Sequence, residues 1–93
     1  MAILRVEHGV PDFDAWKRER FDRDPLNRAE SGVRRYRVFR GAPEPDFASV
    51  ELEFDTFDEA EAFAGRLREM WQDVGELSNP TVRILEEVES TEL

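Results

Sequence analysis

The stretch from Ala48 to Gly75 most constrains the fold, because two hydrophobic periods meet within it. Across residues 48–54, apolar side chains alternate with serine and glutamate, which is the period-two pattern of a β-strand with one buried face. Across residues 57–74, apolar side chains recur three and four positions apart, which is typical of an amphipathic helix. A strand is therefore predicted to run almost directly into the longest helix, with the apolar stripe of the helix on the apolar face of the strand.

The boundary between this strand and this helix carries a helix-start signal. Thr56 and Glu59 have the spacing of a capping box, in which the threonine hydroxyl accepts a hydrogen bond from the glutamate backbone N–H. At the other end Gly75 suits the C′ position, because glycine readily adopts the left-handed conformation found there. The helix is thus predicted to begin at Phe57 and to end at Val74.

The same patterns predict three further strands and one further helix. The further strands are Ala2–His8, Val33–Arg40 and Thr81–Val88, in addition to Ala48–Phe54. Asp12 is placed to cap the other helix, whose apolar positions are Phe13, Trp16 and Phe21. The polar stretch that follows this helix, up to Gly32, is interpreted as a connection.

The predicted element order is βαββαβ, within a single domain that spans residues 1–93. Glycine and proline at residues 41–46 favour a turn, so the second and third strands are expected to form an antiparallel hairpin. Right-handed crossovers then give a four-stranded antiparallel sheet of order 4-1-3-2 with both helices on one face. This α+β arrangement is the ferredoxin-like plait.

The two faces of this sheet are predicted to differ. The helix-covered face is apolar apart from His8 and the Tyr36 hydroxyl, and consists of Leu4, Val6, His8, Tyr36, Val38, Ala48, Val50, Leu52, Phe54, Val82 and Ile84. The opposite face mixes apolar and charged groups: Ile3, Arg5, Glu7, Val33, Arg35, Arg37, Phe39, Ser49, Glu51, Glu53, Arg83, Leu85 and Glu87. Either water covers this mixed face, with weak ion pairs between strands, or the sheet packs on a second copy of itself as a homodimer, which the resemblance described below favours.

Composition narrows the partners and the location. A formal net charge of −9 and a pI near 4.6 argue against a nucleic-acid partner, whose phosphates are bound mainly by lysine and arginine. There is no cysteine, so no disulfide or thiolate site exists. Because neither a signal peptide nor an apolar run of membrane-spanning length is visible, we expect a cytoplasmic protein with no membrane partner.

Several short motifs carry a resemblance to a known superfamily. They are VPDFDAWK at residues 10–17, FD at 21–22, GV at 32–33, YRVFR at 36–40, LEFD at 52–55 and AEAF at 60–63. Together they resemble the small dimeric α/β-barrel proteins, which include antibiotic-biosynthesis-monooxygenase-like and polyketide-cyclase-like members. The resemblance implies that two plaits pack sheet to sheet into one barrel, with a ligand cavity between each sheet and its own helices.

The resemblance also implies two kinds of function. Monooxygenase-like members act without metal or flavin on electron-rich aromatic substrates, and cyclase-like members use histidine and tyrosine together. This chain has a single histidine, which departs from the cyclase pattern. We expect a cofactor-independent monooxygenase or cyclase acting on a planar aromatic or polyketide-like small molecule. The alternative is a non-catalytic dimer that binds a small ligand or a partner, or that has a structural role.

The candidate site is the sheet end at which the first strand reaches His8. An imidazole there can act as a general acid or base near neutral pH, although a histidine satisfied by backbone or water is the alternative. The predicted substrate-binding residues around it are Trp16, Val38, Met70, Trp71 and Asn79. Core packing is the alternative for both tryptophans. One histidine without cysteine predicts no metal site.

Overall fold

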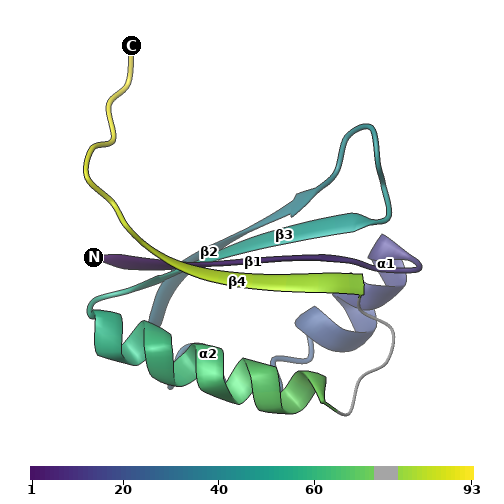
Figure 1. Ribbon diagram of the computed structural model, residues 1–93, viewed down its shortest axis with the longest axis horizontal. Coiled ribbons are helices and arrows are strands. Elements are labelled where there is room, and N and C mark those ends of the chain that lie inside the picture. Colours follow the sequence, from purple (N-terminus) through teal and green to yellow (C-terminus); the bar gives the residue numbers. More distant parts are fainter. Residues whose placement is uncertain (73–77) are drawn as a thin grey trace.

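The fold is one four-stranded antiparallel sheet with the helices on one of its faces (Figure 1). The structure is a computed structural model that describes residues 1–72 and 78–93. Its elements are β1 (Ala2–Gly9), α1 (Phe13–Trp16), the π-helical turn η1 (Lys17–Phe21), β2 (Val33–Arg40), β3 (Phe47–Phe54), α2 (Phe57–Trp71) and β4 (Ser78–Glu86). The strand order is β2-β3-β1-β4, which confirms the predicted order and the ferredoxin-like plait. Within the described ranges, no helix has the length and apolar character needed to cross a bilayer.

Both predicted helix caps form. Thr56 Oγ1 accepts a hydrogen bond from the Glu59 backbone N–H at 3.2 Å and donates to Glu59 Oε1 at 3.2 Å. Asp12 Oδ1 accepts a hydrogen bond from the Ala15 backbone N–H at 3.1 Å. The first helix is shorter than its apolar spacing predicts, because α1 passes after Trp16 into the wider turn η1. The predicted end of the second helix, from Val74 to Gly75, lies outside the described residues.

Strand β4 is placed earlier in the chain than predicted. It begins at Ser78 rather than Thr81 and ends at Glu86 rather than Val88. Proline at position 80 is tolerated because β4 lies at the sheet edge, where one row of backbone N–H groups has no strand partner. Residues 78–80, which precede the predicted strand, are therefore part of β4.

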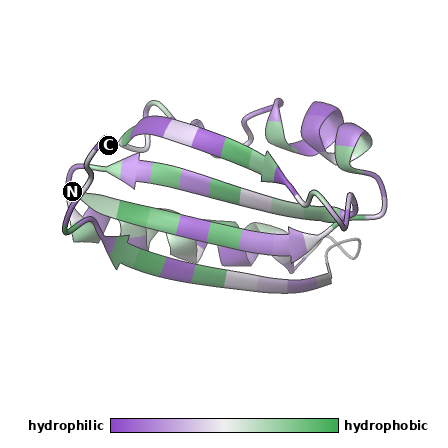
Figure 2. Cartoon of the chain, turned by 90° about the horizontal axis from the view of Figure 1, so that it is seen from above, coloured by the Kyte–Doolittle hydropathy of each residue, from purple (hydrophilic) through white to green (hydrophobic). Residues whose placement is uncertain are grey.

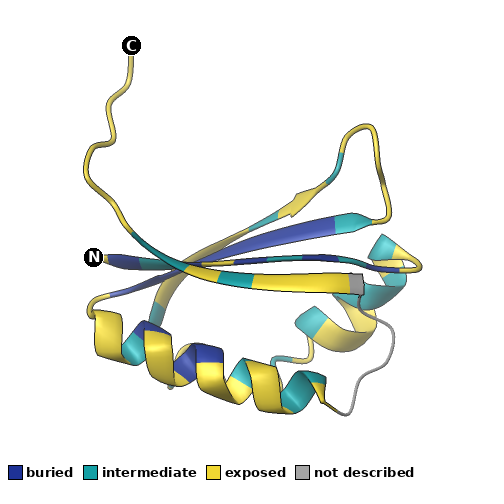
Figure 3. Cartoon of the chain, in the orientation of Figure 1, coloured by how far each residue is buried: buried dark blue, intermediate teal, exposed yellow. Residues whose placement is uncertain are grey.

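The core lies between the two inner strands and α2. Leu4 on β1 and Phe54 on β3 are completely buried, and the Phe54 ring meets the Phe63 ring of α2 with centroids 5.6 Å apart. Ala60 and Ala64, both buried, give α2 a small-residue surface toward the sheet. In Figure 3 the buried segments follow β1, β3 and the inner side of α2, as the predicted alternation requires.

The prediction that Val33 lies on the sheet face opposite the helices is wrong, because β2 contains a β-bulge. The β2–β3 register shifts between Val33 and Arg35, and Val33 pairs directly with Phe54. Since Phe54 points into the core, Val33 lies on the same face and packs against the core cluster. Arg34 is the extra residue, and its guanidinium binds the Asp55 carboxylate at 2.7 Å. One inserted residue reverses the inward and outward alternation.

Burial in the core predicts that Phe54 and Phe57 contribute very differently to the free energy of unfolding. Phe54→Ala should lower the free energy of unfolding by about 3–5 kcal/mol, because it removes a fully buried ring. Phe57→Ala is the matched control, since Phe57 is 54% exposed, and should cost less than about 1 kcal/mol. Urea denaturation followed by circular dichroism measures both, and similar losses would contradict the assigned helix register.

Candidate functional site

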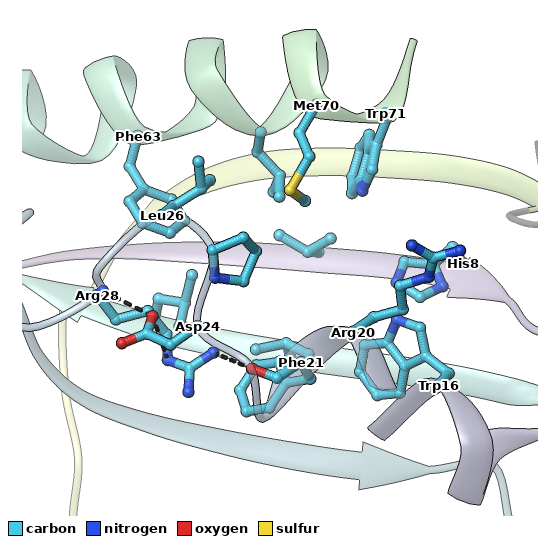
Figure 4. A pocket seen from close by; sticks show the side chains of 15 residues that line it. His8, Trp16, Arg20, Phe21, Asp24, Leu26, Arg28, Phe63, Met70 and Trp71 are labelled. Atoms are coloured by element: carbon cyan, nitrogen blue, oxygen red, sulfur yellow. Dashed lines mark hydrogen bonds and ion pairs between the residues drawn. The ribbon is translucent and has the colours of Figure 1, made fainter. Parts of the chain in front are cut away.

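A pocket opens between the helix-covered face of the sheet, α2 and the segment that runs from α1 to residue 28 (Figure 4). Its cavity volume is about 80 Å³, and its walls are mainly apolar. The lining residues are Val6, His8, Trp16, Arg20, Phe21, Asp24, Pro25, Leu26, Arg28, Val50, Leu52, Phe63, Leu67, Met70 and Trp71. A concave apolar site with a few polar groups is typical of small-molecule binding.

His8 lies at the end of β1, buried between two tryptophans. Only 3% of the residue is exposed. Its ring meets the Trp16 ring at a centroid distance of 5.2 Å and the Trp71 ring at 6.0 Å, both edge to face. These contacts fix the imidazole plane at the pocket wall.

The hydrogen bonding of His8 identifies its basic nitrogen. Nδ1 lies 3.3 Å from the Gly9 carbonyl oxygen, which can only accept, so Nδ1 carries the proton and Nε2 keeps a lone pair. Burial lowers the pKa of His8 below its usual 6.5, against a smaller opposing effect of the Gly9 carbonyl. The ring is therefore neutral at pH 7 and able to accept a proton.

Trp16 and Trp71 both pack in the core and line the pocket, which are the two alternatives that the sequence leaves open. Each is half-buried and packs against the core cluster. Each also lines the pocket, on opposite sides of His8. Met70, beside Trp71 on α2, is half-buried and lines the pocket as well. The structure thus brings His8, both tryptophans and Met70 together.

The other two predicted binding residues do not line this pocket. Val38 is half-buried on β2 and packs against the core cluster. Asn79 is exposed on β4, where it adopts the left-handed backbone conformation with φ of 49°. The alternation and chain direction used for the prediction give a sheet end, but they do not give the depth at which each side chain lies.

One wall of the pocket comes from the segment after η1, which the sequence predicts to be only a polar connection. Asp24 Oδ1 accepts the Arg28 backbone N–H at 2.8 Å and lies 3.6 Å from Arg28 Nε. Arg28 Nη1 donates to the Phe21 carbonyl oxygen at 2.7 Å. Leu26 and Pro25 complete this wall. The signal available in the sequence was the pair Pro25-Leu26, which is isolated inside a charged connection.

The π-helical turn η1 directs two of its residues to the pocket. The Asp22 backbone N–H donates to the Lys17 carbonyl at 2.8 Å, five residues back, which widens the turn relative to an α-helix. Arg20 and Phe21 of this turn both line the pocket. Single π turns within helices are frequent at functional sites.

Comparison with solved structures agrees with this architecture. A Deinococcus radiodurans protein whose name assigns it to the antibiotic biosynthesis monooxygenases matches with a TM-score of 0.70 at 12% identity, over 100% of this chain and 98% of that one. A dimeric ferredoxin-like protein from an uncultured marine organism matches with a TM-score of 0.69 at 10% identity, over 97% of each chain. An EthD family protein from Bacillus halodurans matches with a TM-score of 0.59 at 21% identity, over 95% of this chain and 100% of that one.

The chain shares the ferredoxin-like fold of these solved structures. The predicted resemblance is thereby confirmed for the fold. Sequence identities this low say nothing about activity. No protein-family model matches the sequence, and no curated protein matches it.

Figure 2 shows the sheet face that no helix covers, on which hydrophilic and hydrophobic residues are mixed along the strands. The predicted ion pairs between strands form on this face. Glu51 on β3 binds Arg5 Nη2 at 2.6 Å and Arg37 Nη2 at 2.5 Å, and Glu53 binds Arg35 at 3.1 Å. Both glutamates are buried on this open face, under the arginine side chains. The hydrogen bond from Arg5 contributes most to holding the pKa of Glu51 below its usual range, and Arg37 adds to it.

The lowered pKa of His8 predicts a specific pH dependence of stability. The unfolded chain binds a proton near pH 6.5 more readily than the folded chain, so the stabilisation is complete above pH 6.5 and decreases as pH falls below it. A single titrating group can change the free energy of unfolding by at most about 1.4 kcal/mol per pH unit, which is the upper limit for this decline. Urea unfolding of the wild type and of His8→Gln, compared from pH 7.5 to 5.0, measures it.

The His8→Gln variant should lack this decline, because glutamine does not titrate. The lowered pKa of Glu51 acts in a lower window, where stability is lost as pH falls below the usual value of 4.5 toward the lowered pKa, so it does not interfere above pH 5. Parallel curves for the two proteins would contradict the assignment of a neutral, buried His8.

Proposed function

We propose that this protein binds a small planar aromatic molecule in the His8 pocket and acts on it as a cofactor-independent monooxygenase. The observation that supports this most is a buried, neutral imidazole held between two tryptophan rings at the wall of an apolar pocket. The fold shared with a protein named for antibiotic biosynthesis monooxygenases is consistent with it.

His8 would act as the base. With Nδ1–H directed at the Gly9 carbonyl, the Nε2 lone pair is the group that can remove a proton from a phenol or an activated ring CH₂. The electron-rich anion then reacts with O₂, and a CH₂ group becomes C=O with release of water. The substrate supplies all the electrons, so this chemistry needs no flavin or metal.

The size of the pocket favours a compact ligand. A cavity of about 150 Å³ holds benzene, and this pocket has about 80 Å³. A single ring therefore requires small movements of the half-buried side chains at the mouth, such as Trp71 and Met70. A multi-ring polyketide would require much larger ones, so we favour a one-ring substrate.

The position of Tyr36 argues against cyclase chemistry in this pocket. Oxygenation and non-catalytic binding remain as candidates. Tyr36 is 45% exposed, packs on Phe21 and is not among the residues that line the His8 pocket. A histidine–tyrosine pair for cyclase chemistry is therefore not assembled there. If His8 moves no proton, the remaining function is non-catalytic binding of the same small ligand.

Oxygen uptake and fluorescence test this proposal. One-ring phenols such as hydroquinone and resorcinol should quench tryptophan fluorescence in the wild type, and an active member of such a panel should drive O₂ consumption. His8→Ala should abolish that consumption while the circular dichroism spectrum is retained. Binding without uptake, unchanged by the variant, would favour the non-catalytic alternative, and failure of every phenol to bind would contradict both.

We also propose that two copies associate through the open sheet face. This face exposes Phe39, at 46%, among arginines and glutamates that are already ordered in cross-strand pairs. Charged groups fixed in this way can set the register of a self-complementary interface. One structural neighbour is described as dimeric.

Charge reversal tests the homodimer. Arg37→Glu should raise the dimer dissociation constant at least about tenfold, because the buried Glu51 would lose a cation and face a like charge. Arg68→Glu on the exposed side of α2 is the control, since it changes the net charge equally but lies on the other layer. Sedimentation velocity measures both, and a wild-type monomer at micromolar concentration would refute the association.

A further inference from the structure

The pocket is elongated, and His8 lies at one of its ends. Its floor is the inner face of the sheet and runs from His8 through the paired residues Val6 and Val50 to Leu52, all of them buried. Leu52 pairs with Leu4, which precedes His8 by four residues on β1. At the usual rise of a strand, the floor therefore extends for about 13 Å away from His8.

The wall formed by α2 has the same extent. Trp71 meets the His8 ring at one end of this wall, and Phe63, which lies eight residues earlier in α2, lines the other end. Eight residues of an α-helix span about 12 Å, and Leu67 and Met70 line the wall between the two aromatic rings. Figure 4 shows this arrangement, with Phe63 and His8 at opposite ends of the pocket.

Hydrogen-bonding groups are distributed unevenly around this length. Among the described residues, the charged side chains of the lining are Arg20, Asp24 and Arg28, and all three come from the wall that the segment after α1 forms. Asp24 and Arg28 already bind each other, at 2.8 Å through the Arg28 backbone N–H. Between His8 and Phe63, the floor and the α2 wall present aliphatic and aromatic side chains and one thioether. A ligand hydroxyl directed at these two surfaces would lose its hydrogen bonds to water without gaining others.

The half of the pocket away from His8 can adapt to a ligand more readily than the floor. Leu26, Leu67 and Met70 are half-buried, and the unbranched methionine side chain adjusts easily to its neighbours. The floor residues Val6 and Val50 are buried in the sheet and have less freedom. A short apolar substituent is accommodated by small movements of the adaptable side chains, whereas a long one exceeds a cavity of about 80 Å³.

We propose that the ligand of this pocket is a phenol with a short alkyl group para to its hydroxyl. The hydroxyl lies at His8, where Nε2 can accept its proton, and the para position is directed along the pocket towards Leu67 and Phe63. In that direction each buried CH₂ group raises the affinity about fourfold, whereas a polar substituent lowers it. This inference rests on the proposed binding of a one-ring phenol in the His8 pocket and adds the kind of substituent that the ring carries.

4-Methylphenol and hydroquinone provide the first test, because they have nearly the same shape and differ by a methyl group in place of a hydroxyl. In isothermal titration calorimetry the wild type should bind 4-methylphenol at least about tenfold more tightly than hydroquinone. Binding of hydroquinone or resorcinol without tighter binding of 4-methylphenol would overturn the inference and leave the proposed function standing. Failure of all three phenols to bind would overturn both.

A pair of isomers separates the shape of the pocket from a general preference for apolar ligands. 4-Ethylphenol and 2-ethylphenol carry the same groups, but the ortho isomer places its ethyl group beside His8 rather than along the pocket. The para isomer should bind at least about tenfold more tightly, because only its two additional carbons are buried between the floor and α2. Equal affinities of the two isomers would overturn the inference.

Two variants locate the substituent. Leu67→Ala enlarges the half of the pocket away from His8 and should raise the affinity for 4-butylphenol at least about tenfold relative to that for 4-methylphenol. Val82→Ala is the matched control and should keep the wild-type ratio, since Val82 is half-buried against the same core cluster but does not line the pocket. If circular dichroism shows that Leu67→Ala does not fold, Leu26→Ala makes the same change on the wall formed after η1. An unchanged ratio in the folded variant would overturn the placement of the alkyl group.

Discussion

Strand β3 is buried along both of its faces, although its sequence alternates between apolar and polar residues. On one face Val50, Leu52 and Phe54 pack against α2 and the inner core. On the other face Glu51 and Glu53 lie under arginines supplied by β1 and β2. The rest of the fold depends on this strand, because the helix layer is positioned by one of its faces and the open face is ordered by the other.

The pocket follows from an uneven helix layer. The long helix α2 covers the sheet beside β1 and β4, whereas the remaining area is covered by the short α1, the turn η1 and the connection after it (Figure 1). These shorter pieces cannot fill the space as one continuous helix would. The gap between the two parts is lined by His8, and the Asp24–Arg28 pair keeps its outer wall in place.

The sequence predicts the parts of this molecule that are determined locally. The alternation in β3, the Thr56 cap and the helical spacing of α2 each occupy a continuous segment, so periodicity and cap chemistry identify them. The position of His8 at the end of the sheet follows from the direction of β1 alone. The bulge after Val33 and the pocket wall around Arg28 depend on contacts between distant segments, which leave no period in the sequence. For the same reason alternation placed Val38 and Asn79 at the pocket, although neither lines it.

The wide turn η1 makes the pocket sensitive to chain length as well as to residue identity. A π turn holds one residue more than an α-helical turn. Loss of a single residue between Trp16 and Asp22 would restore α-helical spacing and rotate the following side chains by about 100° around the helix axis. Arg20 and Phe21 would then leave the pocket even if every remaining amino acid were unchanged. Insertions and deletions in this segment would therefore change the lining of the pocket more than most substitutions within it.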